Sequence, residues 1–234
     1  MSAVASLTAG ARSAGSRLQQ RSSILVLVAA LLSAVVIAVL ERHAGVVGAA
    51  DRALVGVFRL VVPLVAFAYL QTAIGPENLR EAVWPIARYG HHRGFVALGY
   101  GVAGTAVAAG VSLLAGIVAL LVARLGAADA DSAMPLATDL AVTSFIAVAV
   151  SFGYGGWLAL GATFGRAGGG RGIVLLADFL VGSLGFFAVV LPRGAAYSLI
   201  GREAALDLSA RVSSILLAAV TLLCFALTFV RCRR

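Results

Sequence analysis

Long apolar runs separated by short polar loops dominate the pattern of this chain. A helix needs about 20 apolar residues to cross the hydrocarbon core of a bilayer. A helix also satisfies its own backbone hydrogen bonds, as lipid requires. The pattern therefore predicts an all-α, polytopic integral membrane protein with six transmembrane helices. The predicted spans are 24–40, 54–74, 95–122, 136–164, 173–191 and 212–230.

One polar stretch, residues 75–94 (GPENLREAVWPIARYGHHRG), interrupts this pattern between the second and third spans. Residues 76–89 predict a short amphipathic helix, because Pro76 suits a first helical turn and Glu77 favours the positive N-terminal end of the helix dipole. A helix this short and two-sided cannot span a bilayer and lies in the headgroup plane. It is either a passive connector or a docking element for a soluble partner.

The flanking segments are basic and short. Residues 1–23 contain arginine and no acid, which is typical of a mobile cytoplasmic tail or of a helix on the membrane surface. A cleaved signal peptide is disfavoured because the run 24–40 is longer than a usual signal core. The domain organisation is thus an N-terminal tail, a transmembrane domain over 24–230 and a basic tail over 231–234.

Two charged residues fall inside predicted spans. Arginine at the centre of a membrane helix costs about 2.5–3.5 kcal/mol on insertion scales, so Arg59 is expected to reach the outer headgroups by snorkelling, and a substrate site is the alternative. Asp178 is the acid most worth testing for function, and the simpler interpretation is a locally hydrogen-bonded or water-reached carboxylate. The two residues lie nearer opposite faces of the membrane, so we do not expect them to meet.

Small residues recur at every fourth position of the third span. In lipid, small side chains let helix backbones approach closely and gain dispersion contacts. The ridge either packs against other helices of the same subunit or forms a dimer seam, and the sequence does not separate these interpretations. Its members are Gly104, Ala108, Ser112 and Gly116.

Composition agrees with the membrane assignment and excludes a soluble globular protein. The chain has 61% hydrophobic residues, 12% charged residues and a mean hydropathy of +1.02. All 18 basic residues are arginine, and they are scattered rather than gathered, which argues against nucleic-acid binding.

The arginines also orient the predicted spans. Eleven fall on the side of the termini and residues 75–94, six fall on the opposite side, and Arg59 completes the 18. The basic excess predicts that both termini and residues 75–94 face the cytoplasm of a bacterial inner membrane.

No motif for catalysis is present. The sequence has no HExxH, no CxxC and no phosphate-binding loop. Cys224 and Cys232 do not form a disulfide framework, and His91 and His92 have no neighbouring acid or cysteine to complete a metal site. We therefore predict no catalytic residue, no metal site, no cofactor and no enzymatic activity in this chain.

The layout of six spans in 234 residues, with a cytoplasmic amphipathic segment after the second, resembles the ABC-2 type membrane subunits of ATP-binding cassette exporters. The likeness is best over 58–122. There, Asn78-Leu79-Arg80-Glu81 running into Trp84-Pro85-Ile86-Ala87-Arg88 is similar to the family's acidic helix followed by a P-[IL]-[SA]-R turn. The family's usual Gly-Thr before the leucines is missing, which leaves the register of the coupling helix open.

The resemblance implies a permease subunit without an ATPase of its own. A separate ATP-binding-cassette ATPase would dock on the coupling helix, and two permeases, as a homodimer or heterodimer, would enclose the substrate path. The alternative is a membrane scaffold that anchors a larger complex without transporting anything. The implied partner-binding residues are Asn78, Leu79, Glu81, Val83, Trp84, Pro85 and Arg88.

Overall fold

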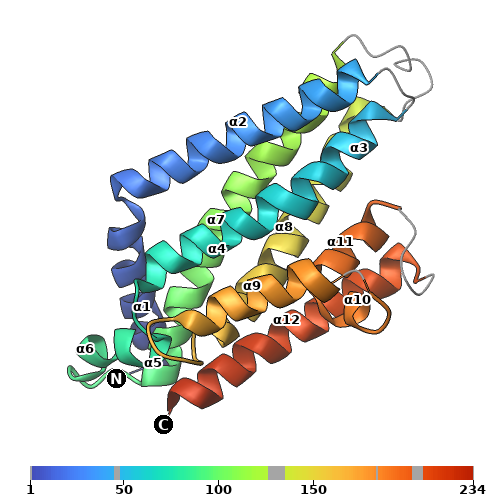
Figure 1. The fold of residues 1–234 in the computed structure, drawn as a ribbon. Helices are drawn as coiled ribbons and strands as arrows, with labels where there is room; N and C mark the ends of the chain where they lie inside the picture. The colour runs from blue at the N-terminus through green and yellow to red at the C-terminus, as the bar shows by residue number, and fades with distance from the viewer. Residues whose placement is uncertain (1, 45–47, 126–134, 183, 202–207, 234) are drawn as a thin grey trace.

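The computed structural model describes residues 2–44, 48–125, 135–182, 184–201 and 208–233, and all regular structure in these ranges is helical (Figure 1). This confirms the predicted all-α class. Five helical stretches are long and apolar enough to cross a membrane. They are Arg21–His43, Ala49–Ala82, Arg93–Arg124, Leu136–Gly161 and Ala210–Arg233.

Most of the long helices extend beyond the apolar runs that predicted them. Helix α2 (Arg21–His43), α7 (Arg93–Arg124) and α12 (Ala210–Arg233) each continue into flanking arginine-bearing turns. Helix α8 (Leu136–Gly161) instead ends three residues before the predicted limit of 164. Arg202 and Arg234, which entered the topology argument, lie outside the described residues.

The second predicted span is built from three consecutive helical parts. Helix α3 (Ala49–Gly56) continues through a π-helical turn, η1 (Val57–Val61), into α4 (Val62–Ile74). The π turn carries Arg59, and single π turns inside α-helices are frequently found at functional sites. Arg59 is an exposed residue of this turn.

Helix α7 is the centre of the bundle, with α1, α2, α4, α8 and α12 packed around it. The ridge of small residues, Gly104, Ala108, Ser112 and Gly116, is buried within the chain. A Cβ atom on Gly104 would lie 3.1 Å from Ala73 Cβ of α4, and one on Gly116 would lie 3.2 Å from Thr143 Cγ2 of α8. The ridge therefore packs against helices of the same subunit.

The first residues form a docked helix, α1 (Ala3–Leu18), instead of a mobile tail. Its backbone approaches α7 so closely that a Cβ atom on Gly99 would overlap the carbonyl oxygen of Leu7. The Ser13 and Tyr100 hydroxyl oxygens are 2.6 Å apart, within hydrogen-bonding distance. The N-terminal segment is thus part of the folded domain.

The predicted span 173–191 is not one helix. Helix α9 (Gly169–Val181) is followed by a turn, a short α10 (Phe187–Val190) and α11 (Pro192–Leu199). At about 1.5 Å per residue, α9 is roughly 20 Å long, which is shorter than the hydrocarbon core. Gly185 adopts a positive φ of 46°, and Leu191 is extended before Pro192, so the chain leaves the helical conformation twice.

Replacing Gly99 by leucine should release α1, because the new side chain would occupy the space of the α1 backbone. Overpacking of this kind costs about 1–3 kcal/mol. We expect faster trypsin cleavage after the exposed Arg12 in G99L than in the native protein. Gly110→Leu on the same helix is the matched control, because no atom lies within 4 Å of its Cβ position. Equal cleavage of the two variants would contradict the docking of α1.

Candidate functional site

Residues 75–94 lie at the end of the bundle that also carries both ends of the described chain (Figure 1). The predicted single helix is instead two single turns, α5 (Leu79–Ala82) and α6 (Trp84–Ala87), which meet at Val83. Pro85 has no N–H to donate, so the helical hydrogen-bond ladder is interrupted there. The side chain of Asn78 caps α5 by accepting the backbone N–H of Arg80 at 3.0 Å.

One half of this segment is buried against the turn between α8 and α9. Asn78, Leu79 and Val83 are each less than 9% exposed. The backbone N–H of Leu79 donates to the carbonyl of Ala162 at 2.9 Å, and the Asn78 amide nitrogen donates to the carbonyl of Gly165 at 2.7 Å. These three residues, which the resemblance assigned to partner binding, anchor the segment to its own chain.

The other half faces outward. Glu81, Pro85 and Arg88 are exposed, and Trp84 retains 44% of its surface. The guanidinium carbons of Arg88 and Arg93 lie 5.4 and 4.3 Å from the centre of the Trp84 ring, which are cation–π distances. The outward half therefore presents an aromatic ring held by arginine, together with an acid.

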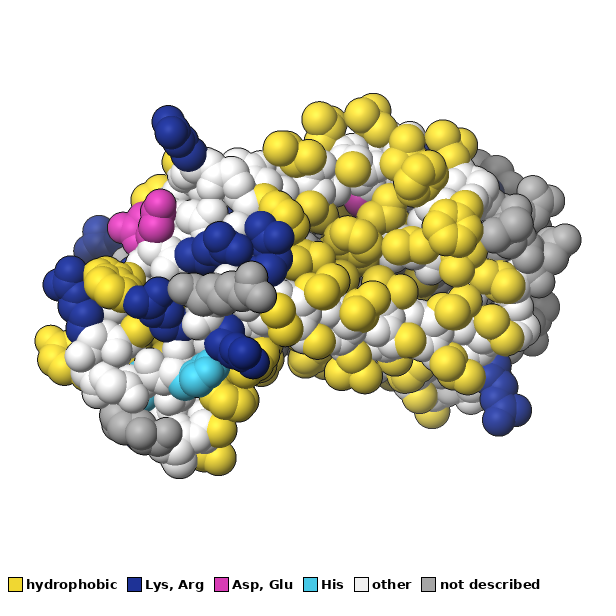
Figure 2. Space-filling model, turned by 90° about the horizontal axis from the view of Figure 1, so that it is seen from below, with side chains coloured by type: hydrophobic (Ala, Val, Ile, Leu, Met, Phe, Trp, Pro, Cys, Tyr) yellow, Lys and Arg dark blue, Asp and Glu magenta, His cyan; other side chains and the backbone are white. Residues whose placement is uncertain are grey.

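Arginine side chains gather at this end of the molecule, whereas hydrophobic side chains cover most of the remaining surface in the same view (Figure 2). The contrast is typical of a polar end projecting from an apolar membrane body.

Two arginines from other elements hold the carboxyl end of α4, where the segment begins. Arg17 of α1 donates to the carbonyl of Ile74. Arg171 of α9 is fully buried and donates to the carbonyls of Gly75 at 2.9 Å and Glu77 at 3.1 Å. Burial lowers the pKa of Arg171 to about 10, so it remains charged at neutral pH. A cation at a helix C-terminus is stabilised by the helix dipole.

A second polar cluster lies deeper in the bundle, around Asp178 of α9. Asp178 is 1% exposed, and its Oδ2 accepts the Tyr154 hydroxyl at 2.7 Å. Its Oδ1 accepts the backbone N–H of Arg193 at 3.3 Å, and the Arg193 Nε atom is 3.7 Å from Oδ2. Asp178 is therefore a hydrogen-bonded carboxylate beside a buried cation.

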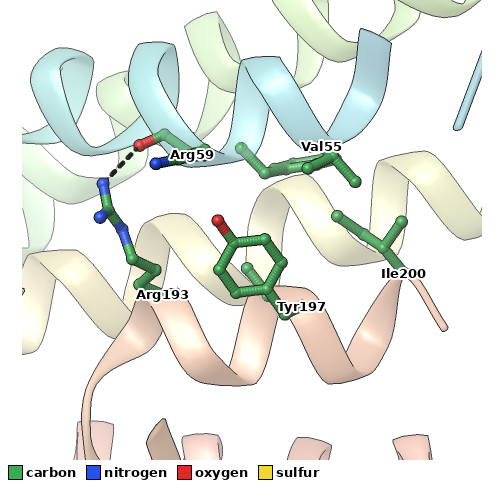
Figure 3. Close-up of a pocket in the computed structure, with 7 residues that line it drawn as sticks. Val55, Arg59, Arg193, Tyr197 and Ile200 are labelled. Atoms are coloured by element: carbon green, nitrogen blue, oxygen red, sulfur yellow. Dashed lines mark hydrogen bonds between the residues drawn. The ribbon is translucent and has the colours of Figure 1, made fainter. Parts of the chain in front are cut away.

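Arg193 connects this cluster to the π turn. Its guanidinium donates to the carbonyl of Phe179 at 3.0 Å. It also donates to the carbonyl of Arg59 at 3.0 Å (Figure 3). Asp178 and Arg59 were expected to lie apart, and their side chains do not pair. The Arg59 backbone nevertheless joins the cluster through Arg193, a residue that the sequence placed in a loop.

Sequence reasoning missed the burial of Arg171 and Arg193. Both stand beside proline or glycine in apparent loops, where arginine usually faces water. The available signals were the proline before Arg193, which can start a helix, and the glycine-rich turn before Arg171. Neither signal indicates which side chain is buried.

The side chains of the second cluster bind one another and neighbouring peptide groups. Tyr154 donates to Asp178, and Arg193 donates to Asp178 and to the carbonyl of Phe179. The described residues contain no group of three or more histidine, cysteine or acidic side chains that could hold a metal. The arrangement is suited to fixing helices relative to one another.

No protein-family model, no curated protein and no solved structure matches this chain.

Removing one partner of the Asp178–Arg193 pair should destabilise the protein more than removing both. A buried pair broken from one side leaves an uncompensated charge and costs about 3–5 kcal/mol, whereas an apolar replacement of both partners is often neutral. We expect Asp178→Leu to lower the unfolding midpoint strongly and Asp178→Leu with Arg193→Met to recover most of it. Unfolding in a harsh detergent would measure the midpoints of the single and double variants. If the effects of the two substitutions on the midpoint simply add, the coupling between Asp178 and Arg193 is contradicted.

Proposed function

We propose that this chain is the membrane-spanning permease subunit of an ABC-type transporter, most simply an exporter, in a bacterial inner membrane. A separate ATPase subunit docks on the outward half of residues 75–94. The observation that carries the proposal is the division of this segment into an anchored half and a presented half. The buried half fixes the segment to its own chain, and the exposed half is free for a partner.

The geometry of the segment suits the transfer of movement. It follows directly on α4 at Ile74 and leads directly into α7 at Arg93. Helix α5 is fixed to the α8–α9 turn by the Leu79 and Asn78 hydrogen bonds, and α6 follows it directly, so the segment can act as a handle. A partner that displaces such a handle moves the two attached membrane helices as bodies, as switching between two states requires.

The arrangement of the helices supports six membrane crossings with both termini inside. Five complete crossings would leave the two chain ends at opposite ends of the bundle, yet both lie beside residues 75–94 (Figure 1). The interrupted segment from α9 to α11 accounts for the remaining crossing. The arginine excess at this end then orients it towards the cytoplasm.

A second permease, identical or different, completes the transporter in this proposal. The buried ridge on α7 is used within the subunit, so another surface has to form the contact. Lipid covers the remaining apolar faces, such as the exposed leucines of α2, Leu25, Leu32 and Leu40.

The orientation can be tested with single cysteines. Tyr89, which is 82% exposed, marks the 75–94 end, and His43 marks the opposite end of α2. The native Cys224 and Cys232 are each 2% exposed and should give little background. We expect a membrane-impermeant maleimide to label His43→Cys in intact cells. Tyr89→Cys should be labelled only after the cells are permeabilised. Labelling of Tyr89→Cys in intact cells would exclude a cytosolic partner.

The docking surface can be tested by its effect on partner recovery. Pro85→Gly with Arg88→Glu should abolish co-purification of an ATP-binding-cassette ATPase, because both residues belong to the exposed half. Arg12→Glu, an equally exposed reversal of charge on α1, is the control and should retain the ATPase. Recovery of a stable membrane complex without any such ATPase would favour the scaffold alternative. Unchanged ATPase recovery by the double variant would remove the docking claim.

A further inference from the structure

Helix α9 carries two buried ionisable side chains, Arg171 and Asp178, on an otherwise apolar helix. They are seven residues apart, which is two helical turns or about 10 Å, and so they lie on the same face. The opposite face carries Ile173, Leu176 and Leu180, which are 69%, 58% and 66% exposed. One side of α9 thus binds the protein through charges, and the other side is available to lipid.

At its first end, α9 is bound to residues 75–94. The Arg171 guanidinium donates to the carbonyls of Gly75 and Glu77, and also to that of Leu70 in α4 at 3.5 Å. In the part of the chain that the structure describes, no carboxylate is within ion-pair distance of Arg171. Its charge is therefore compensated by peptide carbonyls at the negative end of α4.

At its second end, α9 is bound to the π turn. Asp178 accepts from Arg193 of α11, and Arg193 donates to the carbonyl of Arg59 (Figure 3). The π turn η1 lies in the same continuous helix as α4, whose other end Arg171 holds. Helix α9 is consequently clamped to both ends of the α4 region by guanidinium–carbonyl bonds.

The strength of these clamps follows from their surroundings. Burying leucine side chains between helices gains little in lipid, because leucine side chains and lipid tails are equally apolar. A buried guanidinium that loses its acceptors has no water to replace them, and a hydrogen bond to a charged group is the costly one to break. Movement of the handle is therefore carried by the polar contacts.

We propose that Arg171 is a positioning residue that makes α9 move with residues 75–94, so that displacement of this segment reaches the π turn through Asp178 and Arg193. The source of that displacement rests on the proposed function, namely the docked ATPase. The link itself depends on the contacts described above. Single π turns inside α-helices are frequently found at functional sites, which makes η1 a suitable receiving element.

The first arm of the test needs no partner. Spin labels on Tyr89→Cys and Leu176→Cys report the distance between the handle and α9 in the full chain, reconstituted in lipid nanodiscs with Cys224 and Cys232 replaced by serine. We expect one narrow distance distribution for the parent and a broad one for Arg171→Gln. Arg166→Gln is the matched control, because Arg166 is an exposed arginine of the turn that leads into α9. A narrow distribution in Arg171→Gln would overturn the proposal.

The second arm uses the complex with the co-purified ATPase. Labels on Leu60→Cys and Leu184→Cys report the far end, with and without ATP and vanadate. We expect ATP and vanadate to shift the distance between these two labels in the parent and in Arg166→Gln. In Arg171→Gln we expect the effect of nucleotide on the equilibrium between the two distances to fall by roughly 2- to 30-fold, the range for residues along such networks. ATP turnover should persist in Arg171→Gln, since its contacts lie away from the exposed half.

The conservative variant separates positioning from mere stability. Arg171→Lys keeps the charge but lacks the planar fork that reaches several carbonyls, so it should restore folding and only part of the far-end shift. It also replaces Arg171→Gln as the informative variant if the latter does not fold. A full far-end shift in Arg171→Lys and Arg171→Gln would refute the role of Arg171. Absence of any ATPase would refute the proposed function, while the first arm would still decide on the link.

Discussion

The structure depends on guanidinium groups that donate to backbone carbonyls at the ends and interruptions of its helices. Arg17 and Arg171 donate at the carboxyl end of α4, and Arg193 donates at the π turn. Each of these places exposes carbonyls that the regular helix does not use. In an apolar medium such groups need a partner, and arginine supplies several donors in one plane.

These contacts fix the conformation of residues 75–94 at the polar end of the molecule. The segment is too short to be stable alone, because two single turns cannot offset the cost of helix nucleation. Hydrogen bonds from Asn78 and Leu79 to the α8–α9 turn fix it from one side. The capped end of α4 fixes it from the other. Function at this surface would therefore be served by a rigid element and not by a flexible loop.

Close packing and polar contacts both hold the helices of the bundle together. Small residues of α7 lie in close contact with α1, α4 and α8. Helix α9 has a wide lipid-facing side, and its Gly170 packs closely on Gly161 of α8. Its two charged residues add hydrogen bonds to α4, α8 and α11, so α9 is joined to the bundle by one packed face and by polar contacts.

The sequence by itself determined the membrane class, most of the span positions and the place of the polar segment, because hydropathy is a local property of the chain. It also located Asp178 as an unusual buried acid. Tertiary structure alone decided that Asn78, Leu79 and Val83 turn inward, that α9 stops short of a full span, and that Arg171 and Arg193 are buried. The buried positions of Arg171 and Arg193 depend on carbonyls from residues 14 to 134 positions away, and no local pattern encodes such partners.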